Sequence, residues 1–474
     1  MDEQQQREPR PVNPRRRKKT PLEIFKEVYL PVVIAGAALI LILIFIIGSI
    51  VRGFQFRKLE AQAAYDASVS AQQEQDRLAA EANGLLAQAA ALAAQFDYEG
   101  AVSVLDNFTG DPSQFPELVD KRQEYQTQQD QLVLWTDRAA IPNLSFQLLI
   151  ADPMRAFNDE DYADAYKRNF ITTAEFSRIL EQLYENDYIL ISTDDLVAYE
   201  SNDGSAAIYF AEKPLYLPAG KKPIIITQTN VNYNLYMVDS DEDMIADQGG
   251  DGFASKLVID ANGNLANEIV HSDGTVETGA YDLVPILEAF IATHPDFSYK
   301  GARAVITLTG YNGLFGYRTH AEAQAQLDPA TYEQQIEDAR SVAYALQEAG
   351  YELACYSYEN RDYSAMTPAQ IEADLSGWTA EVVPILGQVD TFVFARETDI
   401  AGKNEVYESD SYRVLQNAGF SYYMGYCEDG KPWMSVNDNY VRQGRLVVSA
   451  QNLTNYPDWF SGILDPATVL VEAR

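Results

Sequence analysis

An uncharged run near the start of the sequence limits most what this chain can fold into. Residues 28–51 read VYLPVVIAGAALILILIFIIGSIV and contain no Asp, Glu, Lys or Arg. At about 1.5 Å per residue, a helix of this length is roughly 36 Å long, enough to cross a hydrocarbon layer about 30 Å thick. We therefore expect residues 28–51 to form a transmembrane helix rather than a buried helix of a water-soluble protein.

The charges on either side of this run predict its orientation. Eight Lys and Arg residues precede it, five of them at positions 15–19. Arg52, Arg57 and Lys58 follow it, where a cleavable signal peptide would have small residues. By the positive-inside rule, residues 1–27 form a cytoplasmic basic tail. We expect an uncleaved, single-pass anchor in the cell membrane, with the main domain extracellular.

Composition excludes several classes of protein. The 474 residues carry a net charge of −35, and because residues 1–58 have a surplus of 6 positive charges, the remainder carries −41. A nucleic-acid partner is not expected, since it would need a basic surface. Two Cys residues cannot form a disulfide framework, and three His residues leave little material for a metal site. A hydrophobic content of 47 % is enough for a sizeable core.

Residues 52–137 predict a helical stalk or small bundle outside the membrane. Residues 59–94 are rich in Ala, Gln and Glu, which favour helix, and further helices are expected at 98–107 and 116–135. The run ALAAQFDYEGAVSVLDNF is similar to the helix–turn–helix seam of a tetratricopeptide unit. Such arrays need about three repeats, and the sequence offers one. A plain spacer is favoured, and a protein partner for the stalk is the alternative.

Residues 141–474 predict one α/β domain. Short apolar runs alternate with amphipathic segments, and Asn262-Gly263 predicts a hairpin. Strand–helix repetition of this kind favours a parallel sheet closed into a barrel, with functional residues at the carboxyl ends of the strands. The strands are expected at 141–150, 188–192, 223–227, 304–308, 352–356 and 391–395, and the helices from 173 and at 281–293 and 332–348.

The same region resembles a known family. The segments, in order, are IPNLSFQ, TAEFSRILEQLYENDYILISTDDL, LPAGKKPIIITQTN, ALQEAGYELACYSYEN, DTFVFARETD and YRVLQNAGFSYYMGY. They are similar to segments of the polysaccharide deacetylases, also called the NodB-homology or carbohydrate esterase 4 family. The resemblance implies an α/β fold, a distorted (β/α) barrel of the polysaccharide deacetylase type, here preceded by one transmembrane helix and a helical stalk.

The resemblance also implies where chemistry would occur. In that family a Thr-Phe-Asp-Asp motif supplies a general base and a ligand of a divalent metal such as zinc, and two His residues complete the metal site. Here Thr229 occupies the base position, and the ligand positions hold Asn230, Tyr356 and Asn360. Amides and a phenol are poor zinc ligands. The resemblance therefore implies degenerate catalytic motifs, no metal site and no cofactor.

An active enzyme with a relocated site is the alternative. His320 and Arg318 follow one predicted strand, and the loops after others contain carboxylates that could form an acid–base pair. A solvated acidic rim is the favoured interpretation of those carboxylates, which are Glu359, Asp362, Glu397 and Asp399. His271 and His294 are expected to be structural.

The two Cys residues and one acidic segment are not expected to take part in chemistry. Cys355 is expected to be a buried, unreactive thiol, and a bridge to Cys427 is left open. The acidic segment 239–243 lacks the Gly and Glu of a calcium-binding EF-hand at the required spacing, so an exposed hinge is expected there.

A degenerate site still predicts a groove able to hold sugars. Aromatic faces pack on the C–H groups of a sugar ring, while amides and guanidinium groups meet hydroxyls. We expect a pseudoenzyme that acts as a glycan-binding or scaffolding module at the cell envelope, with cell-wall polysaccharide as a partner. The alternative is a metal-dependent hydrolase that removes N-acetyl groups from polysaccharide. The candidate groove residues are Asn230, Tyr233, Tyr236, Tyr356, Tyr358, Asn360, Arg361 and Arg396.

Overall fold

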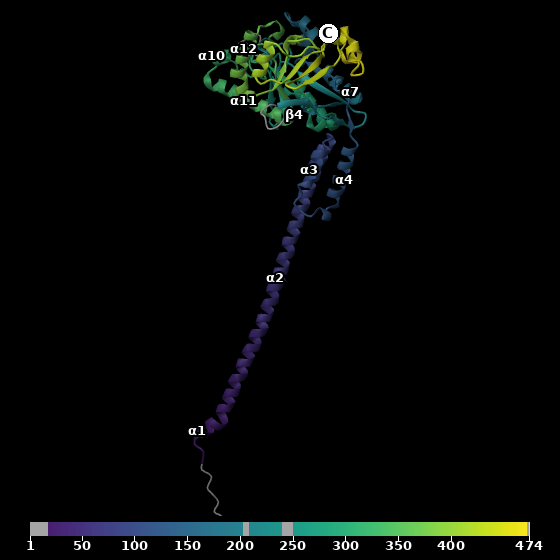
Figure 1. Cartoon of the computed structure of the whole chain (residues 1–474). Helices are drawn as coiled ribbons and strands as arrows, with labels where there is room; N and C mark the ends of the chain where they lie inside the picture. The colour runs from purple at the N-terminus through teal and green to yellow at the C-terminus, as the bar shows by residue number, and fades with distance from the viewer. Residues whose placement is uncertain (1–17, 202–207, 239–249, 472–473) are drawn as a thin grey trace, which may run out of the picture. The chain divides into compact units, whose positions relative to one another are not determined.

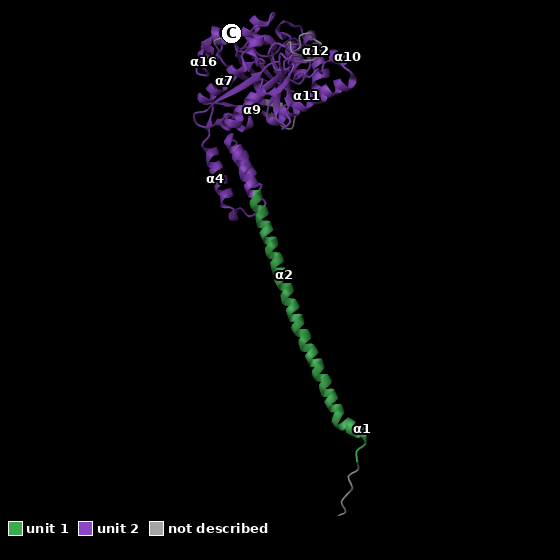
Figure 2. Cartoon of the chain, turned by 180° about the vertical axis from the view of Figure 1, so that it is seen from behind, with its two compact units in different colours: residues 1–81 green, residues 82–474 purple. Residues whose placement is uncertain are grey.

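The computed structural model describes residues 18–201, 208–238, 250–471 and 474. The chain divides into two compact units, Met1–Glu81 and Ala82–Arg474, which Figure 2 colours separately.

The first unit is dominated by a long apolar helix. Helix α1 (Pro21–Ile24) begins after Thr20, whose backbone N–H donates to Glu23 Oε2 at 2.9 Å. A single π-helical turn, Phe25–Tyr29, leads into α2 (Leu30–Ala94), labelled in Figure 1. Among the described residues, this helical stretch is the one that is long and apolar enough to cross a membrane, and its apolar window is exposed. The predicted apolar helix is therefore present, and it continues past residue 52 without a break.

The second unit begins with a helical hairpin formed by the end of α2 together with α3 (Tyr98–Asp106) and α4 (Pro116–Asp130). The Asp97 side chain caps α3 by accepting from the Gly100 N–H at 3.0 Å. Small side chains at Ala89 and Ala101 are completely buried, which lets the helices pack closely. The three expected helices are present, and the last ends five residues earlier than predicted.

Seven parallel strands close into a barrel in the remainder of the second unit. Their order around the barrel is β2, β7, β11, β12, β13, β14 and β16, and β16 pairs with β2 to close the ring. The strands are β2 (Asn143–Phe146), β7 (Lys222–Gln228), β11 (Val305–Leu308), β12 (Glu352–Cys355), β13 (Thr391–Val393), β14 (Tyr422–Tyr426) and β16 (Tyr440–Val447). This confirms the predicted distorted (β/α) barrel.

Further strands and helices surround this ring, and Figure 1 shows several of the helices around the strands. Strand β3 (Tyr188–Leu190) pairs with the first half of β7, and β15 (Met434–Asn437) runs antiparallel to β16. The other strands are β1 (Val133–Leu134), β4 (Val197–Ser201), β5 (Ile208–Glu212), β6 (Tyr216–Leu217), β8 (Lys256–Ile259), β9 (Leu265–Val270) and β10 (Val276–Gly279). The other α-helices are α5 (Pro153–Ala156), α6 (Ala163–Asn169), α7 (Thr173–Glu185), α8 (Leu235–Val238), α9 (Leu283–Thr293), α10 (Ala321–Gln326), α11 (Pro329–Ala349), α12 (Pro368–Gly377), α13 (Val383–Leu386), α14 (Asp410–Asn417), α15 (Ala450–Asn455) and α16 (Pro466–Val469).

The interior of the barrel becomes more polar toward the carboxyl ends of its strands. Alternate residues of a strand point to the same face, so Val441, Gln443 and Arg445 of β16 share one face. Val441 belongs to an apolar cluster inside the barrel. Above it, Gln443 Oε1 accepts from Asn143 Nδ2 at 3.2 Å, and Asn143 Oδ1 accepts from Thr227 Oγ1 at 2.8 Å. A neutral polar layer thus separates the apolar cluster inside the barrel from the barrel mouth.

Most of the predicted elements are present with shifted ends. The hairpin at Gly263, whose φ of 85° suits glycine, joins β8 and β9 as expected. The strand expected at 141–150 ends at Phe146, because the chain then leaves the barrel and the Leu149 N–H donates to Asp282 Oδ1 at 2.9 Å. Strand β16 lies outside the expected strands, whereas β14 falls within the segment YRVLQNAGFSYYMGY that resembles the family.

Candidate functional site

The carboxyl ends of five barrel strands converge on one cavity of about 220 Å³. Its position, at the mouth of a parallel barrel, is where such folds place functional residues. Larger hollows lie elsewhere, such as one of about 400 Å³ lined by Leu375 and Val414, but they are not at the carboxyl ends of the barrel strands. The lining residues of the mouth cavity are Ser145, Phe146, Gln147, Thr229, Asn230, Tyr356, Asn360, Arg396, Glu397, Arg445 and Val447.

Four residues at this mouth have left-handed backbone conformations. The φ angles are 59° at Asn230, 52° at Asn360, 57° at Arg396 and 56° at Glu397. Positive φ is uncommon for residues other than glycine, and such strain gathers at functional sites. Hydrogen bonds hold it in place: the Asn230 N–H donates to Thr307 Oγ1 at 3.0 Å, and Arg396 Nε donates to the Asn360 carbonyl at 3.0 Å. The rim is therefore fixed by the backbone.

Arg445 brings a buried positive charge to the floor of the cavity. Only 1 % of the residue is exposed. Its Nε, Nη1 and Nη2 donate to the Gly425 carbonyl at 3.1 Å, Ser145 Oγ at 3.1 Å and the Phe394 carbonyl at 2.7 Å. Burial lowers the pKa of Arg445, while the neighbouring Tyr356 opposes that shift. A guanidinium remains charged at neutral pH under these conditions.

The predicted ligand positions do meet at this cavity, but they do not suit a divalent metal. Asn230, Tyr356 and Asn360 all line it, offering two amides and a phenol where zinc prefers imidazole, thiolate or carboxylate. Within the described part of the chain, no group of three or more His, Cys, Asp or Glu residues could hold a metal ion. The Arg445 guanidinium also lies 5.9 Å from the centre of the Tyr356 ring and would repel a cation.

Thr229, at the position of the general base, offers no base either. It is 5 % exposed, and its hydroxyl donates to the Phe146 carbonyl at 3.1 Å. A threonine hydroxyl in this arrangement has no ionisable group to accept a substrate proton at neutral pH.

Four of the candidate groove residues do not line the cavity. Tyr233 is a correction: its φ of 48° turns the chain inward, and the buried hydroxyl donates to Asp282 Oδ2 at 2.7 Å. Tyr358 packs against Gly310 and is partly buried against the hydrophobic core. Arg361 is exposed and forms an ion pair with Glu359.

Tyr236, the fourth of these residues, contacts the Tyr162 ring at a centroid distance of 5.5 Å, away from the mouth. Of the candidate groove residues, Asn230, Tyr356, Asn360 and Arg396 line the mouth cavity.

The relocated acid–base pair is not assembled by this structure. His320 is buried before α10, where burial and Arg318 lower its pKa to about 4, and neither ring nitrogen has a hydrogen-bond partner among the described residues. Asp362 accepts from the Ser364 N–H at 2.9 Å, and Glu359 pairs with Arg361. Among the residues that the structure describes, Glu397 is the one carboxylate that lines the cavity. Partial desolvation raises its pKa, and Arg445 opposes the shift.

The remaining His and Cys residues lie outside the mouth. His271 pairs with Glu277 at 2.9 Å, and His294 stacks on Phe290 at 4.4 Å. Cys355 and Cys427 are both buried and are not joined by a disulfide, and burial raises the pKa of the Cys355 thiol. The acidic segment 239–243 lies outside the described residues.

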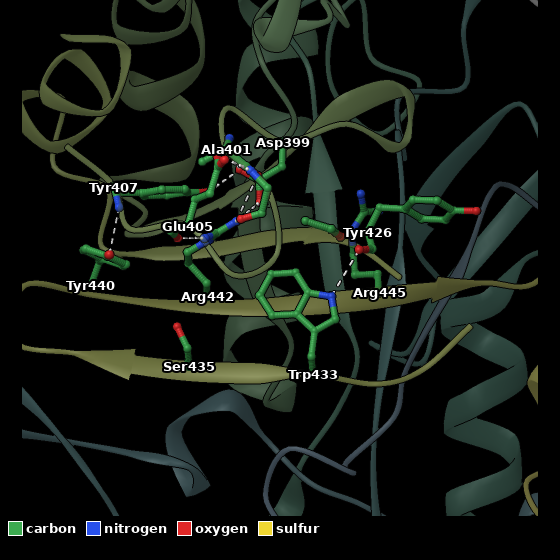
Figure 3. A network of polar contacts seen from close by, with 12 residues as sticks. Asp399, Ala401, Glu405, Tyr407, Tyr426, Trp433, Ser435, Tyr440, Arg442 and Arg445 are labelled. Atoms are coloured by element: carbon green, nitrogen blue, oxygen red, sulfur yellow. Dashed lines mark hydrogen bonds and ion pairs between the residues drawn. The ribbon is translucent and has the colours of Figure 1, made fainter. Parts of the chain in front are cut away.

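A buried ion pair anchors the loop that carries part of the mouth. Arg442 Nη2 donates to Asp399 Oδ2 at 2.9 Å, and the guanidinium lies 4.3 Å from the Tyr407 ring centre and 5.2 Å from that of Trp433. Figure 3 shows this network beside Arg445, which lies on the same strand. Because they are three residues apart, Arg442 and Arg445 point to opposite faces of β16. The loop that begins with Arg396 is thus tied to the strand that carries Arg445.

Sequence reasoning missed Arg445 because β16 itself was missed. The alternation of Val441, Gln443 and Arg445 is present in the sequence, but a strand whose inner face becomes polar does not show the usual apolar period.

Comparison with known proteins gives distant structural neighbours. No family model matches the chain, and no curated protein matches it. One solved structure, the Streptococcus pyogenes deacetylase PplD in complex with acetate, is 10 % identical, with 71 % of this chain and all of that chain covered and a TM-score of 0.34. A candidate polysaccharide deacetylase of Bacillus anthracis is 10 % identical, with 70 % and 69 % covered and a TM-score of 0.31. Values this low assign no activity to the chain.

Proposed function

We propose that this chain is a membrane-anchored protein whose barrel binds glycan outside the cell without hydrolysing it. The apolar helix supplies the anchor. The excess of Lys and Arg before it favours a cytoplasmic N-terminus by the positive-inside rule, with the second unit on the other side. Cell-wall polysaccharide is the partner that this location would present.

The observation that carries the proposal is the chemistry of the mouth cavity. Asn230, Asn360 and Gln147 provide amides that can donate to and accept from sugar hydroxyls. Tyr356 adds an aromatic face for the C–H groups of a ring. The cavity volume of about 220 Å³ is below the roughly 300–1,000 Å³ of sites for drug-sized ligands. It suits one sugar residue of a longer chain.

Binding is tested with the full chain in non-ionic detergent and chitotriose as a neutral probe, followed by saturation-transfer NMR. Tyr356→Ala should abolish most of the transfer, because it removes the aromatic face from the cavity. Tyr344→Ala is the matched control, since Tyr344 is 63 % exposed on α11, outside the cavity. Equal transfer in the parent and Tyr356→Ala, with unchanged circular dichroism, would defeat the proposal.

Topology is tested by cysteine labelling in intact cells. The native thiols Cys355 and Cys427 are buried and should not react with a membrane-impermeant maleimide. Ser113→Cys, at an exposed position beside α4, should be labelled, and Thr20→Cys should be labelled only after lysis. The reverse pattern would place the second unit in the cytoplasm.

A hydrolase with a relocated site is the second candidate function, and Glu397 is the observation that favours it. This carboxylate lines the cavity, and desolvation raises its pKa, as suits a general acid or base. The parent chain should then release acetate from N-acetylated glycan, and Glu397→Gln should stop the release. No acetate from the parent, with and without added zinc, removes this candidate and leaves binding alone.

A further inference from the structure

The buried guanidinium of Arg445 has hydrogen-bonding capacity left over at the cavity. A guanidinium has five N–H groups, and three of those of Arg445 donate to Gly425, Ser145 and Phe394. The two others are one on each terminal nitrogen, and the Tyr356 side chain also acts as a hydrogen-bond partner of the guanidinium. Arg445 lines the cavity, with the Tyr356 ring beside it at 5.9 Å. A planar pair of donors on two nitrogens matches the two oxygens of a carboxylate.

The charge of Arg445 also lacks a counter-ion in contact. Among the described residues, none forms an ion pair with it. Two other buried arginines differ: Arg442 pairs with Asp399, and Arg474 pairs with Glu175. A charge buried without a partner is costly to the fold, and a ligand that supplies the opposite charge removes that cost.

A second guanidinium reaches the same cavity from the rim. Arg396 is exposed, lines the cavity and is oriented by its bond to the Asn360 carbonyl. With Glu397 opposite in sign, the charged lining sums to one positive charge, in a chain whose net charge is −35. One surplus positive charge favours a singly charged anion over a doubly charged phosphate.

We propose that the mouth cavity recognises a carboxylate-bearing sugar, with Arg445 and Arg396 binding the carboxylate and the amides binding the ring hydroxyls. This inference rests on the proposed glycan-binding function and names its ligand class. The carboxylate would be the recognition element in an otherwise acidic domain that repels anionic polymers.

The test compares galacturonic acid with its methyl ester, which keeps the ring and removes the charge. The full chain in non-ionic detergent is titrated with each sugar, and the dissociation constants are measured by saturation-transfer NMR. The acid should bind about tenfold more tightly, as loss of a charge-assisted hydrogen bond predicts. Inorganic phosphate, added as a competitor, should displace the acid only weakly.

Variants assign the effect to the cavity. Arg396→Gln should weaken binding of the acid about fivefold or more and leave the ester unchanged, since it removes one charge-assisted contact. Arg361→Gln is the matched control, because Arg361 is exposed, lies outside the cavity and pairs with Glu359. Arg445→Lys keeps the charge and loses the fork, so it should weaken binding of the acid while circular dichroism stays the same.

The possible results distinguish the failure of carboxylate recognition from the failure of glycan binding itself. Equal binding of acid and ester overturns carboxylate recognition but is consistent with glycan binding. Binding of chitotriose without binding of the acid leads to the same conclusion. Phosphate that competes as strongly as the acid also overturns it and assigns a phosphate-bearing ligand. An equal loss in Arg396→Gln and Arg361→Gln overturns the assignment to this cavity. Binding of no sugar at all defeats both proposals.

Discussion

Removing Arg442 should destabilise the second unit far more than removing an exposed arginine. In Arg442→Met, the Asp399 carboxylate loses its cation, and the Asp399 side chain is only 12 % exposed. Breaking a buried ion pair in this way costs about 3–5 kcal/mol, because a charge remains buried without a partner. The lost stacking on Tyr407 and Trp433 acts in the same direction. We therefore expect a loss of at least about 3 kcal/mol.

The assay is urea unfolding of the full chain in non-ionic detergent, followed by the fluorescence of Trp433 and the other tryptophans. Arg413→Met is the matched control, since the Arg413–Asp410 pair is exposed and should contribute about 0–1 kcal/mol. Adding Asp399→Asn to Arg442→Met should restore part of the stability, because a neutral amide needs no counter-ion.

The same variant should weaken ligand binding although Arg442 points away from the cavity. Asp399 lies in the loop that starts with Arg396 and Glu397, so releasing it loosens two residues of the rim. An Arg442→Met protein that loses less than about 1 kcal/mol, the range of an exposed pair, would refute the reasoning about the buried pair. Unchanged binding would refute the link between the loop and the cavity.

Three further predictions follow from buried or crowded positions. Burial raises the pKa of Asp282 to about 6 from 3.8, so the free energy of unfolding should fall by up to about 3 kcal/mol as pH rises from 4 to 7. In Asp282→Asn, urea unfolding should show a smaller fall over this pH range, and a pH profile identical to that of the parent would contradict the prediction. Gly310→Ala places a Cβ 2.0 Å from Tyr358 Cε2 and should destabilise the fold by about 1–3 kcal/mol. Gly84→Ala meets open space in a helix and should stabilise it by about 0.5–1 kcal/mol. Equal shifts of the melting temperature in the two variants would be inconsistent with the packing. Glu397→Gln should tighten binding of galacturonic acid, because it removes a carboxylate that lines the cavity. Weaker binding in the titration would argue against this electrostatic account.

The barrel was predictable because most of its strands are short apolar runs between amphipathic helices. β7 and β11, for example, lie within one or two residues of their predicted ends. The meeting of Asn230, Tyr356 and Asn360 was also predictable, since residues that follow parallel strands share one end of the barrel.

The rest of the site depends on features that apolar periodicity does not show. The positive φ of Tyr233 places the side chain in the core, although Asn230, three residues earlier, lies at the mouth. Arg445 escaped prediction because the inner face of β16 changes from apolar to charged within five residues. A parallel strand buried on both faces is recognised as a continuous apolar run, and the Arg and Gln residues of β16 interrupt such a run.

The position of Arg445 also sets the order in which a hydrolase could be engineered into this barrel. Substituting Asp at Thr229 and Asn230 and His at Tyr356 and Asn360 would rebuild the side chains of a metal site. The permanent charge of Arg445 would remain beside them, held by three hydrogen bonds to β14, β2 and the end of β13. This charge would repel a cation bound at the rebuilt ligands. Removal of the guanidinium is therefore the first substitution to make, and the four others give no benefit before it.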